Sequence, residues 1–579
     1  MNYVAPQKIA QDISPEDLDG VKVTFINMPI REQAKPNVAP LGPTLLASRL
    51  LHYGAEVTIV DLNAYRIEDE AAKKRRLPNG RTLSFIESEE LLGRTFAQVG
   101  DQDLIGISGL ITTLKWQIEV AKMVRRLQPQ TLLVSGGGLA TEFRSGLFDW
   151  IPELDGVAHS EGDDIILKIA FDAKLIRNQG IESAEYSGKL MPYLRGVVDS
   201  RPRFIYDGGR PVNLDNLPYP AFDLMQTDVD GALILERYIQ TPVWGTSAVN
   251  SSATSFEINR NIATISSRGC PFACRFCFRG AQGERNYGVK SATSLANEMV
   301  YYVEKYNVDF VAIVDDNFMV QPERIFDLVP HLKPVVEEYG LSWGTHGRLD
   351  EAADLRPGSS TCEPTIADRL RVEAMYQAGC RYIGFGAESA SPHVLDEMGK
   401  GGFMLSNGTV SKNGFEFPRT MVHGIVNTKN SGIHANCTWI MGYPGESLHD
   451  LQTSVAFIKW QIENATYGLT PGSEAHDAAA GSINQNMFTA TAYPGTEMFD
   501  EPRVRELLTE RFGLHFDRVT GTPISDENFL NYVLELNDAT KMLVSEDNRP
   551  LNFGAIPDDK FIEARNLVDN HQLFEILDM

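Results

Sequence analysis

The sequence predicts an α/β protein with a doubly wound parallel sheet in its N-terminal part, a second series of strand–helix units, and a mainly helical C-terminal region. Short runs rich in β-branched residues alternate with helical runs from residue 21 to residue 150, and the alternation resumes at residue 262. From residue 499 onward the pattern is helical and polar. A chain of 579 residues is too long for one ordinary core, so we expect two or three domains.

The N-terminal sheet is expected to contain strands at residues 21–27, 55–61, 104–108 and 131–135, each a short apolar run of the kind buried in parallel sheets. Ligands of doubly wound sheets bind at the carboxyl ends of the strands. A dinucleotide is not expected there, because no GxGxxG follows the first strand. Three glycines, residues 136–138, follow the fourth strand instead, and they either let a large ligand approach the backbone or form a plain tight turn.

The second series begins after a proline-marked, extended connector at residues 217–224. Six strands are predicted, at residues 262–266, 308–314, 341–345, 382–389, 434–441 and 486–491. Residues 401–432 exceed a short connection and are rich in Gly, Asn, Ser and Lys, so we interpret them as an active-site loop or lid.

Composition excludes several classes of function. The net charge of -24 argues against a general nucleic-acid surface, which needs clustered Lys and Arg. No apolar run approaches the length of a membrane span. With 6 Cys in 579 residues and no signal peptide, a disulfide framework is not expected, and a reducing cytoplasm is the natural setting.

One stretch carries most of the chemical signal. Cys270, Cys274 and Cys277 form a CxxxCxxC array directly after a predicted strand. Three thiolates on a tight loop can hold three irons of a cubane cluster and leave the fourth iron without a protein ligand. A structural zinc site would need four N or S ligands, and the remaining cysteines, Cys362, Cys380 and Cys437, are scattered. The array therefore indicates a cluster with a vacant site or a chance spacing.

The array and its flanks, Ser267 to Gly269, Pro271 and Phe276, resemble the radical S-adenosylmethionine (SAM) superfamily. The resemblance implies a [4Fe-4S] cluster on the three cysteines, which are the expected catalytic and metal-binding residues. It also implies that the open iron chelates SAM and that electron transfer from the cluster releases a 5'-deoxyadenosyl radical. A small-molecule substrate and an electron donor such as flavodoxin or ferredoxin are the expected partners.

The same resemblance implies that the second series of strands forms a partial (β/α)6 TIM-type barrel, with its chemistry at the carboxyl ends of the strands. The expected SAM-binding residues are Phe276, Asp316, Arg348 and Glu388. Glu388 follows a glycine-opened strand end, where a carboxylate can accept hydrogen bonds from ribose, and Arg348 can pair with the SAM carboxylate as a fork-shaped donor. For residues 315–317, helix capping and ligand binding stay equally open.

Five short N-terminal segments, residues 40–42, 60–61, 107–108, 135–138 and 160–162, occur in an order that resembles the Rossmann-like cobalamin-binding domain of one class of radical SAM enzymes. The contacts that this resemblance implies are Leu41, Gly42, Ser108, Ser135, Gly136, Gly137, Glu161 and Gly162. That family often has Gly-Glu-Gly where this chain has Ser160-Glu161-Gly162, so this segment departs from the family pattern at its first residue.

Histidine usage bears on the cobalt. Relatives that replace the cofactor's own base with histidine carry DxHxxG after the first strand, whereas residues 27–33 contain no His. We therefore predict that no histidine ligates cobalt. His159 is interpreted either as a loop residue or as a hydrogen-bond partner of the corrin periphery.

Together these features predict residues 1–200 as the cobalamin-binding domain, 201–260 as a linker, 261–498 as the radical SAM barrel and 499–579 as a region covering the substrate. The implied function is a cobalamin-dependent radical SAM methyltransferase that methylates an unactivated carbon, or a phosphinate phosphorus, through methylcobalamin and a 5'-deoxyadenosyl radical. One alternative is a non-methylating enzyme resembling the anaerobic magnesium-protoporphyrin monomethyl ester cyclase. A cobalamin-binding sensor whose cysteine loop is structural is the other.

Overall fold

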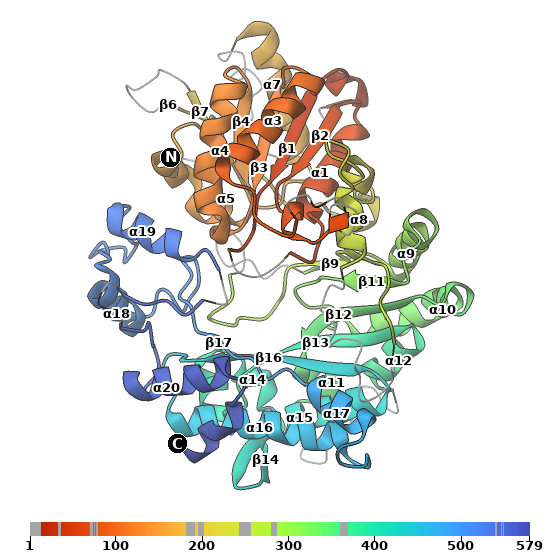
Figure 1. Cartoon of the computed structure of the whole chain (residues 1–579), viewed down its shortest axis with the longest axis vertical. Helices are drawn as coiled ribbons and strands as arrows, with labels where there is room; N and C mark the ends of the chain where they lie inside the picture. Colours follow the sequence, from red (N-terminus) through yellow and green to blue (C-terminus); the bar gives the residue numbers. More distant parts are fainter. Residues whose placement is uncertain are drawn as a thin grey trace. The chain divides into compact units, whose positions relative to one another are not determined.

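The computed structural model describes residues 13–32, 36–69, 73–74, 76, 79–180, 191–194, 202–241, 256–278, 287–358, 369–538, 541–545, 547 and 549–579. The chain divides into two compact units, shown in Figure 1. Unit 1 comprises residues 1–239, 280–283 and 524–539, and unit 2 comprises residues 240–279, 284–523 and 540–579. The four regions predicted from the sequence differ from these two units, and their boundaries stay a prediction.

Unit 1 is built on a seven-stranded sheet with the order β2-β1-β3-β4-β5-β7-β6. Its strands are β1 (Lys22–Asn27), β2 (Glu56–Asp61), β3 (Leu104–Ser108), β4 (Leu132–Gly136), β5 (Gly156–His159), β6 (Met191–Leu194) and β7 (Pro202–Asp207). All neighbours pair in parallel except β6 and β7. The register aligns Asn27 with Ser108 and Ser108 with Gly136, so these residues share the carboxyl edge of the sheet.

Helices connect these strands: α1 (Leu41–Leu51), α3 (Phe85–Val99), α4 (Leu114–Leu127), α5 (Gly137–Phe143), α6 (Leu147–Trp150) and α7 (Ile165–Gln179). A further helix, α8 (Ile234–Ile239), follows the last strand of the sheet. Helix α3 illustrates how the sequence sets its limits. Ser84 and Glu87 form a reciprocal capping box at its start, and Gly100 with φ 80° ends it. Leu91, Leu92 and Phe96 form its buried stripe.

A late segment of the chain belongs to unit 1. Helix α19 (Glu527–Glu535) supplies Phe529, whose ring centroid lies 6.0 Å from that of Phe143 and 5.8 Å from that of Trp150. Phe529 is only 3% exposed. This aromatic cluster completes the core of unit 1 with residues that follow most of unit 2 in the sequence.

Unit 2 is built on a six-stranded parallel sheet with the order β17-β16-β13-β12-β11-β8. Its strands are β8 (Asn261–Thr264), β11 (Phe310–Ile313), β12 (Ser342–Arg348), β13 (Cys380–Glu388), β16 (His434–Met441) and β17 (Phe488–Thr489). The main helices that connect them are α9 (Ala292–Tyr306), α10 (Pro322–Tyr339), α12 (Arg371–Gln377), α15 (Arg419–Asn430) and α16 (Leu448–Thr466). The predicted α/β class, with six βα units in its second part, is confirmed.

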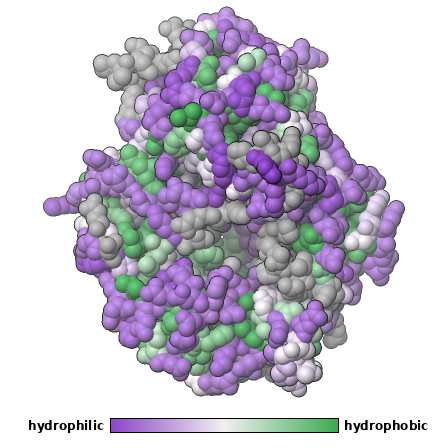
Figure 2. Space-filling model, viewed as in Figure 1, coloured by the Kyte–Doolittle hydropathy of each residue, from purple (hydrophilic) through white to green (hydrophobic). Residues whose placement is uncertain are grey.

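Smaller elements complete unit 2: a two-stranded ribbon of β9 (Ser267–Arg268) and β10 (Gly288–Val289), and the helices α11 (Leu349–Ala353), α13 (Pro392–Glu397), α17 (Glu474–Gly481), α18 (Pro502–Phe512) and α20 (Asp558–Asp569). No helix among the described residues is long and apolar enough to span a membrane. On the face drawn in Figure 2, hydrophilic residues predominate and apolar side chains form scattered patches.

The prediction that residues 401–432 form a loop was wrong, and their role as a lid stays a prediction. The segment contains α14 (Gly401–Met404), a hairpin of β14 (Thr409–Lys412) and β15 (Phe415–Pro418), and the helix α15. Helix α15 buries Met421 and Ile425 on one face. A Cβ at Gly424 would lie 2.3 Å from the Leu349 carbonyl oxygen, so this glycine allows close packing on α11. The helix α15 was not predicted because the segment is rich in polar residues and because glycine takes up part of its narrow buried face.

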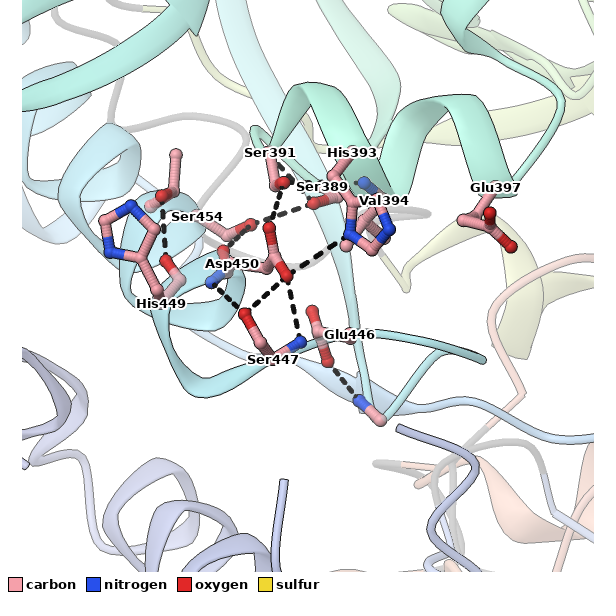
Figure 3. A network of polar contacts seen from close by, with 12 residues as sticks. Ser389, Ser391, His393, Val394, Glu397, Glu446, Ser447, His449, Asp450 and Ser454 are labelled. Atoms are coloured by element: carbon pink, nitrogen blue, oxygen red, sulfur yellow. Dashed lines mark hydrogen bonds and ion pairs between the residues drawn. The ribbon is translucent and has the colours of Figure 1, made fainter. Parts of the chain in front are cut away.

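One carboxylate holds two helix starts together in unit 2 (Figure 3). Asp450 Oδ1 accepts a hydrogen bond of 2.5 Å from Ser391 Oγ, the N-cap of α13. Its Oδ2 accepts hydrogen bonds from the Ser447 backbone N–H at 2.9 Å and from Ser447 Oγ at 2.6 Å, and Ser447 is the N-cap of α16. His393 Nδ1 lies 3.4 Å from the same oxygen. Asp450 thereby links the start of α13 to the start of α16 through their N-cap serines.

We expect Asp450→Asn to lower the free energy of unfolding of unit 2, followed on the urea transition of that unit, by about 1–2 kcal/mol, the usual cost of losing a helix cap. Burial acts to raise the pKa of Asp450, but hydrogen bonds from Ser391 and Ser447 outweigh it, so the pKa lies below its ordinary value of 3.8. A depressed folded-state pKa contributes stability above that ordinary value and loses it as the pH falls through the folded-state pKa. Urea midpoints of the two proteins should therefore differ constantly from pH 8 to pH 5 and converge below about pH 4. An unchanged gap in acid would contradict the assignment.

Candidate active site

The three array cysteines lie on the loop that follows β8 and β9, at the carboxyl end of the unit 2 sheet. Backbone hydrogen bonds fix this loop from two sides: Arg275 N donates to Met398 O at 2.9 Å, and Met498 N donates to Arg275 O at 2.8 Å. Gly399 has φ 71°, and a Cβ there would lie 2.8 Å from the Ala273 carbonyl oxygen. The glycine is required for this close approach.

The thiols influence one another electrostatically. Burial is the largest cause of a raised pKa at Cys270 and at Cys277, and Cys274 adds to it in both cases. The pKa of Cys277 is raised to about 12, although the residue as a whole is exposed, because neighbouring groups crowd its sulfur. In the metal-free protein the thiols of Cys270 and Cys277 are therefore protonated near neutral pH, and binding iron requires them to release their protons.

The donor set fits an iron-sulfur cubane. Three cysteines on one short loop supply three thiolates, and Cys270, Cys274 and Cys277 are all free of disulfides. No three or more His, Cys, Asp or Glu side chains among the described residues converge closely enough to hold a single metal ion. A cubane, in contrast, takes each thiolate on a separate corner.

Next to the loop, residues 315–317 follow the carboxyl end of β11 (Phe310–Ile313). Asp315 is buried and accepts hydrogen bonds from Ser266 N at 2.6 Å, Ser266 Oγ at 2.6 Å and Ser267 N at 3.0 Å. Asn317 Oδ1 accepts from the Met319 backbone N–H at 3.2 Å. Both outer residues therefore support the local structure, whereas Asp316 between them is exposed. Its proposed SAM contact stays a prediction.

Glu388 ends β13 with φ 64°, a left-handed conformation that is uncommon for a residue with a side chain. The pairing of β13 with β16 shifts register at this point. Lys400 Nζ lies 3.6 Å from Glu388 Oε1 and donates to the Gly386 carbonyl oxygen at 2.6 Å. Thr438 Oγ1 donates to Glu388 Oε2 at 3.3 Å. The carboxylate is thus held at the strand end, and its role toward SAM stays a prediction.

Arg348 ends β12 and is buried. Its Nε and one terminal nitrogen donate to the two oxygens of Asp350 at 3.0 and 3.2 Å. The other terminal nitrogen, Nη1, lies 3.7 Å from Cys274 Sγ. Arg348 therefore lies beside the cysteine loop, and two of its guanidinium nitrogens are already paired with a carboxylate of the protein, so its predicted contact with SAM stays a prediction. Asp350 lies only two residues after Arg348, so this ion pair could have been predicted from the sequence.

In unit 1, the predicted cobalamin contacts gather at the carboxyl edge of the sheet. Ser108 and Gly136 end neighbouring strands, and Gly137 begins α5 with φ 84°. A Cβ at Gly137 would lie 2.8 Å from Ser108 Oγ, so only glycine fits there. Ser135 is fully buried and donates to Gln117 Oε1 at 2.7 Å, which engages its hydroxyl inside the unit.

The other predicted contacts come from two neighbouring segments. Leu41 and Gly42 lie in the first turn of α1. Glu161 is paired with Arg210, whose Nε lies 2.6 Å from Glu161 Oε1. Gly162 packs near Leu46, since a Cβ there would lie 3.2 Å from the Leu46 side chain. Sequence reasoning did not anticipate Arg210, because its pairing depends on the fold.

His159, at the end of β5, is buried within unit 1. Its Nδ1 lies 3.2 Å from Asp207 Oδ1. Burial lowers the pKa of His159 to about 4, and the nearby Arg144 cation adds to this effect. The imidazole is therefore neutral near neutral pH. Its two interpretations, loop residue or corrin partner, both stay open.

Comparisons with known proteins agree with this geometry. Residues 264–458 match the radical SAM superfamily. A protein named as an uncharacterized methyltransferase of Pyrococcus horikoshii is 24% identical over 413 residues, covering 70% of this chain and 71% of that protein. The anaerobic magnesium-protoporphyrin IX monomethyl ester cyclase of Cereibacter sphaeroides is 20% identical over 299 residues, covering 52% of this chain and 42% of the cyclase.

Two solved structures have the same fold. The cobalamin-dependent SAM radical enzyme OxsB, with aqua-cobalamin and SAM bound, matches with a TM-score of 0.57 at 14% identity, covering 96% of this chain and 67% of OxsB. The radical SAM methyltransferase TsrM from Kitasatospora setae, with cobalamin and a [4Fe-4S] cluster bound, matches with a TM-score of 0.54 at 15% identity, covering 87% of this chain and 78% of TsrM.

The family match shows that residues 264–458 form a radical SAM domain, and the cysteine loop lies within this domain on the six-stranded half-barrel, so the chain is an enzyme. Within that superfamily, the chain has the fold of the cobalamin-dependent members, with an N-terminal Rossmann-like sheet before the barrel. The predicted resemblance is thus confirmed. Membership implies a [4Fe-4S] cluster and SAM. The individual ligand contacts predicted above are not tested by these comparisons.

Proposed function

We propose that the chain is a cobalamin-dependent radical SAM methyltransferase that acts on an unactivated carbon, or a phosphinate phosphorus, of a small molecule. The observation that carries the proposal is the presence in one chain of a three-cysteine loop at the carboxyl end of a half-barrel and of a separate doubly wound sheet with a glycine-opened carboxyl edge. The methyltransferase relative from Pyrococcus horikoshii and the fold shared with TsrM and OxsB support it.

When bound, the cluster would supply the electron that cleaves SAM to a 5'-deoxyadenosyl radical, and cobalamin would carry the methyl group. In this proposal Cys270, Cys274 and Cys277 hold the cluster. Phe276, Asp316 and Glu388 bind SAM. The carboxyl edge of the unit 1 sheet binds cobalamin through the residues named above, and its neutral histidine does not ligate cobalt.

The proposed reaction needs a reduced cluster. The five cysteines that the structure describes are all free thiols. We infer a reducing compartment, the cytoplasm, and a one-electron donor such as flavodoxin or ferredoxin. The substrate is inferred to be a small molecule.

The alternative is oxidation or ring closure without methyl transfer, which the similarity to the magnesium-protoporphyrin cyclase favours. The two functions use SAM differently. Methylation consumes one SAM as methyl donor and releases S-adenosylhomocysteine, whereas the alternative releases 5'-deoxyadenosine alone.

The test is anaerobic reconstitution with iron, sulfide and hydroxocobalamin, followed by incubation with SAM, a reductant and candidate substrates. We expect bound cobalamin in the absorption spectrum, 5'-deoxyadenosine, S-adenosylhomocysteine, and a product heavier by one methylene. Deoxyadenosine with an oxidised or cyclised product would support the alternative. Material that binds cobalamin but never cleaves SAM would overturn both and favour a sensor protein.

A further inference from the structure

Arg348 contacts the cysteine loop in a way that SAM binding does not explain. Its guanidinium carbon lies 4.1 Å from the ring centroid of Phe272, the residue midway between Cys270 and Cys274 in the array. Phe403 of α14 adds a second ring at 5.9 Å, and the two rings contact each other edge to face with 5.2 Å between centroids. The cation is thus fixed on the loop by aromatic faces.

The fixed guanidinium has a defined direction. Asp350 accepts two hydrogen bonds from Arg348, and both side chains are only 7% exposed. This pairing leaves Nη1 directed at Cys274 Sγ, at 3.7 Å. At this distance the Nη1–H group donates a hydrogen bond to the sulfur. The position of the guanidinium is set by Asp350, Phe272 and Phe403.

Donors to the ligand sulfurs have a known effect on iron-sulfur clusters. Hydrogen bonds to the sulfurs and nearby charge set the reduction potential, because they stabilise the state that carries more negative charge. The cluster gains one negative charge when it accepts an electron from its donor. An arginine at a ligand sulfur therefore favours the reduced cluster, and a carboxylate beside that arginine opposes it.

We propose that Arg348 is a positioning residue that donates a hydrogen bond to the Cys274 sulfur and raises the reduction potential of the cluster, and that Asp350 aims it and moderates its charge. This inference rests on the proposed cluster. It assigns Arg348 to the sulfur, whereas the sequence assigned it to the SAM carboxylate.

The test is a redox titration of the reconstituted full chain without SAM, poised with dithionite and mediators and followed by the electron paramagnetic resonance signal of the reduced cluster. Arg348→Met removes the donor and the charge. We expect the ratio of reduced to oxidised cluster at a fixed poise to fall about tenfold, which is a shift of about 59 mV to lower potential for one electron. Asp350→Asn keeps Arg348 and removes the opposing charge, so the potential should shift in the opposite direction.

Arg381→Met is the matched control. It also removes one positive charge from unit 2, but Arg381 lies near the start of β13, where it stacks on Tyr376 at 4.2 Å. We expect its potential to equal that of the wild type. Arg348→Lys keeps the charge without the fork, and we expect an intermediate potential.

The outcomes separate this inference from the proposed function. A wild-type protein without the resonance signal of a reduced cluster would overturn the cluster assignment itself. A wild-type signal with potentials unchanged in Arg348→Met, or shifted in the same direction in Arg348→Met and Asp350→Asn, would overturn only the role of Arg348. If Arg348→Met fails to assemble a cluster, the opposed shifts expected of Arg348→Lys and Asp350→Asn decide the question.

Discussion

Replacing any one of Cys270, Cys274 and Cys277 with alanine should abolish the formation of 5'-deoxyadenosine from SAM. The structure places all three on one loop. With only two thiolates left, a second iron of the cluster would have no protein ligand. The loss should exceed about 100-fold, since that much is lost when only a second-shell partner of a metal site is removed. The measurements are iron and sulfide content after reconstitution, the absorption of the cluster, and deoxyadenosine by liquid chromatography.

Cysteines elsewhere in unit 2 provide the controls. Cys380 in β13 and Cys437 in β16 are buried, so alanine at either position removes a thiol without touching the loop. These two variants should keep the iron content and the SAM cleavage of the wild type. An array variant that retains full iron and full SAM cleavage would contradict the cluster assignment, and a Cys437→Ala protein without iron would point to a different ligand set.

The strands could be predicted from the sequence because their signal is local. The run around Phe25 and Ile26 is apolar on both faces, which is what a buried parallel strand requires, and the same holds for Phe310 to Ile313. Helix α15 escaped prediction because Gly424 stands where a larger apolar residue would have marked its buried face. The packing of α15 on α11 is a tertiary contact, which cannot be predicted from the local sequence pattern.

The site divides in the same way. The three cysteines could be proposed as cluster ligands from their spacing and their flanking residues, since cluster ligands on one loop are close in sequence. The partners that orient the predicted ligands were missed, because Lys400 beside Glu388 and Arg210 beside Glu161 are ion pairs between different segments. Only Asp350 was within reach of sequence reasoning. The contacts to SAM and cobalamin remain predictions.

Phe529→Ala should destabilise unit 1 by about 3–5 kcal/mol, the usual cost of removing a buried aromatic side chain from a core. Phe529 packs against the contacting pair Phe143 and Trp150, and its loss leaves a cavity that the two shorter helices α5 and α6 cannot close without moving. We expect the loss of stability in unit 1 and not in unit 2, because residues 524–539 belong to unit 1 although they follow most of unit 2 in the sequence.

A protein of two units has no single free energy of unfolding, so hydrogen exchange followed by mass spectrometry is the suitable measurement. Amides of β3 and β4 should exchange faster in Phe529→Ala, because the helices that cover their connections lose a packing partner. Amides of β12 and β13 should keep the wild-type rate. Val519→Ala is the control, since Val519 is 92% exposed and its loss should change neither unit. Faster exchange in β12 and β13 as well would mean that residues 524–539 stabilise unit 2, and the aromatic cluster would then not be what holds α19.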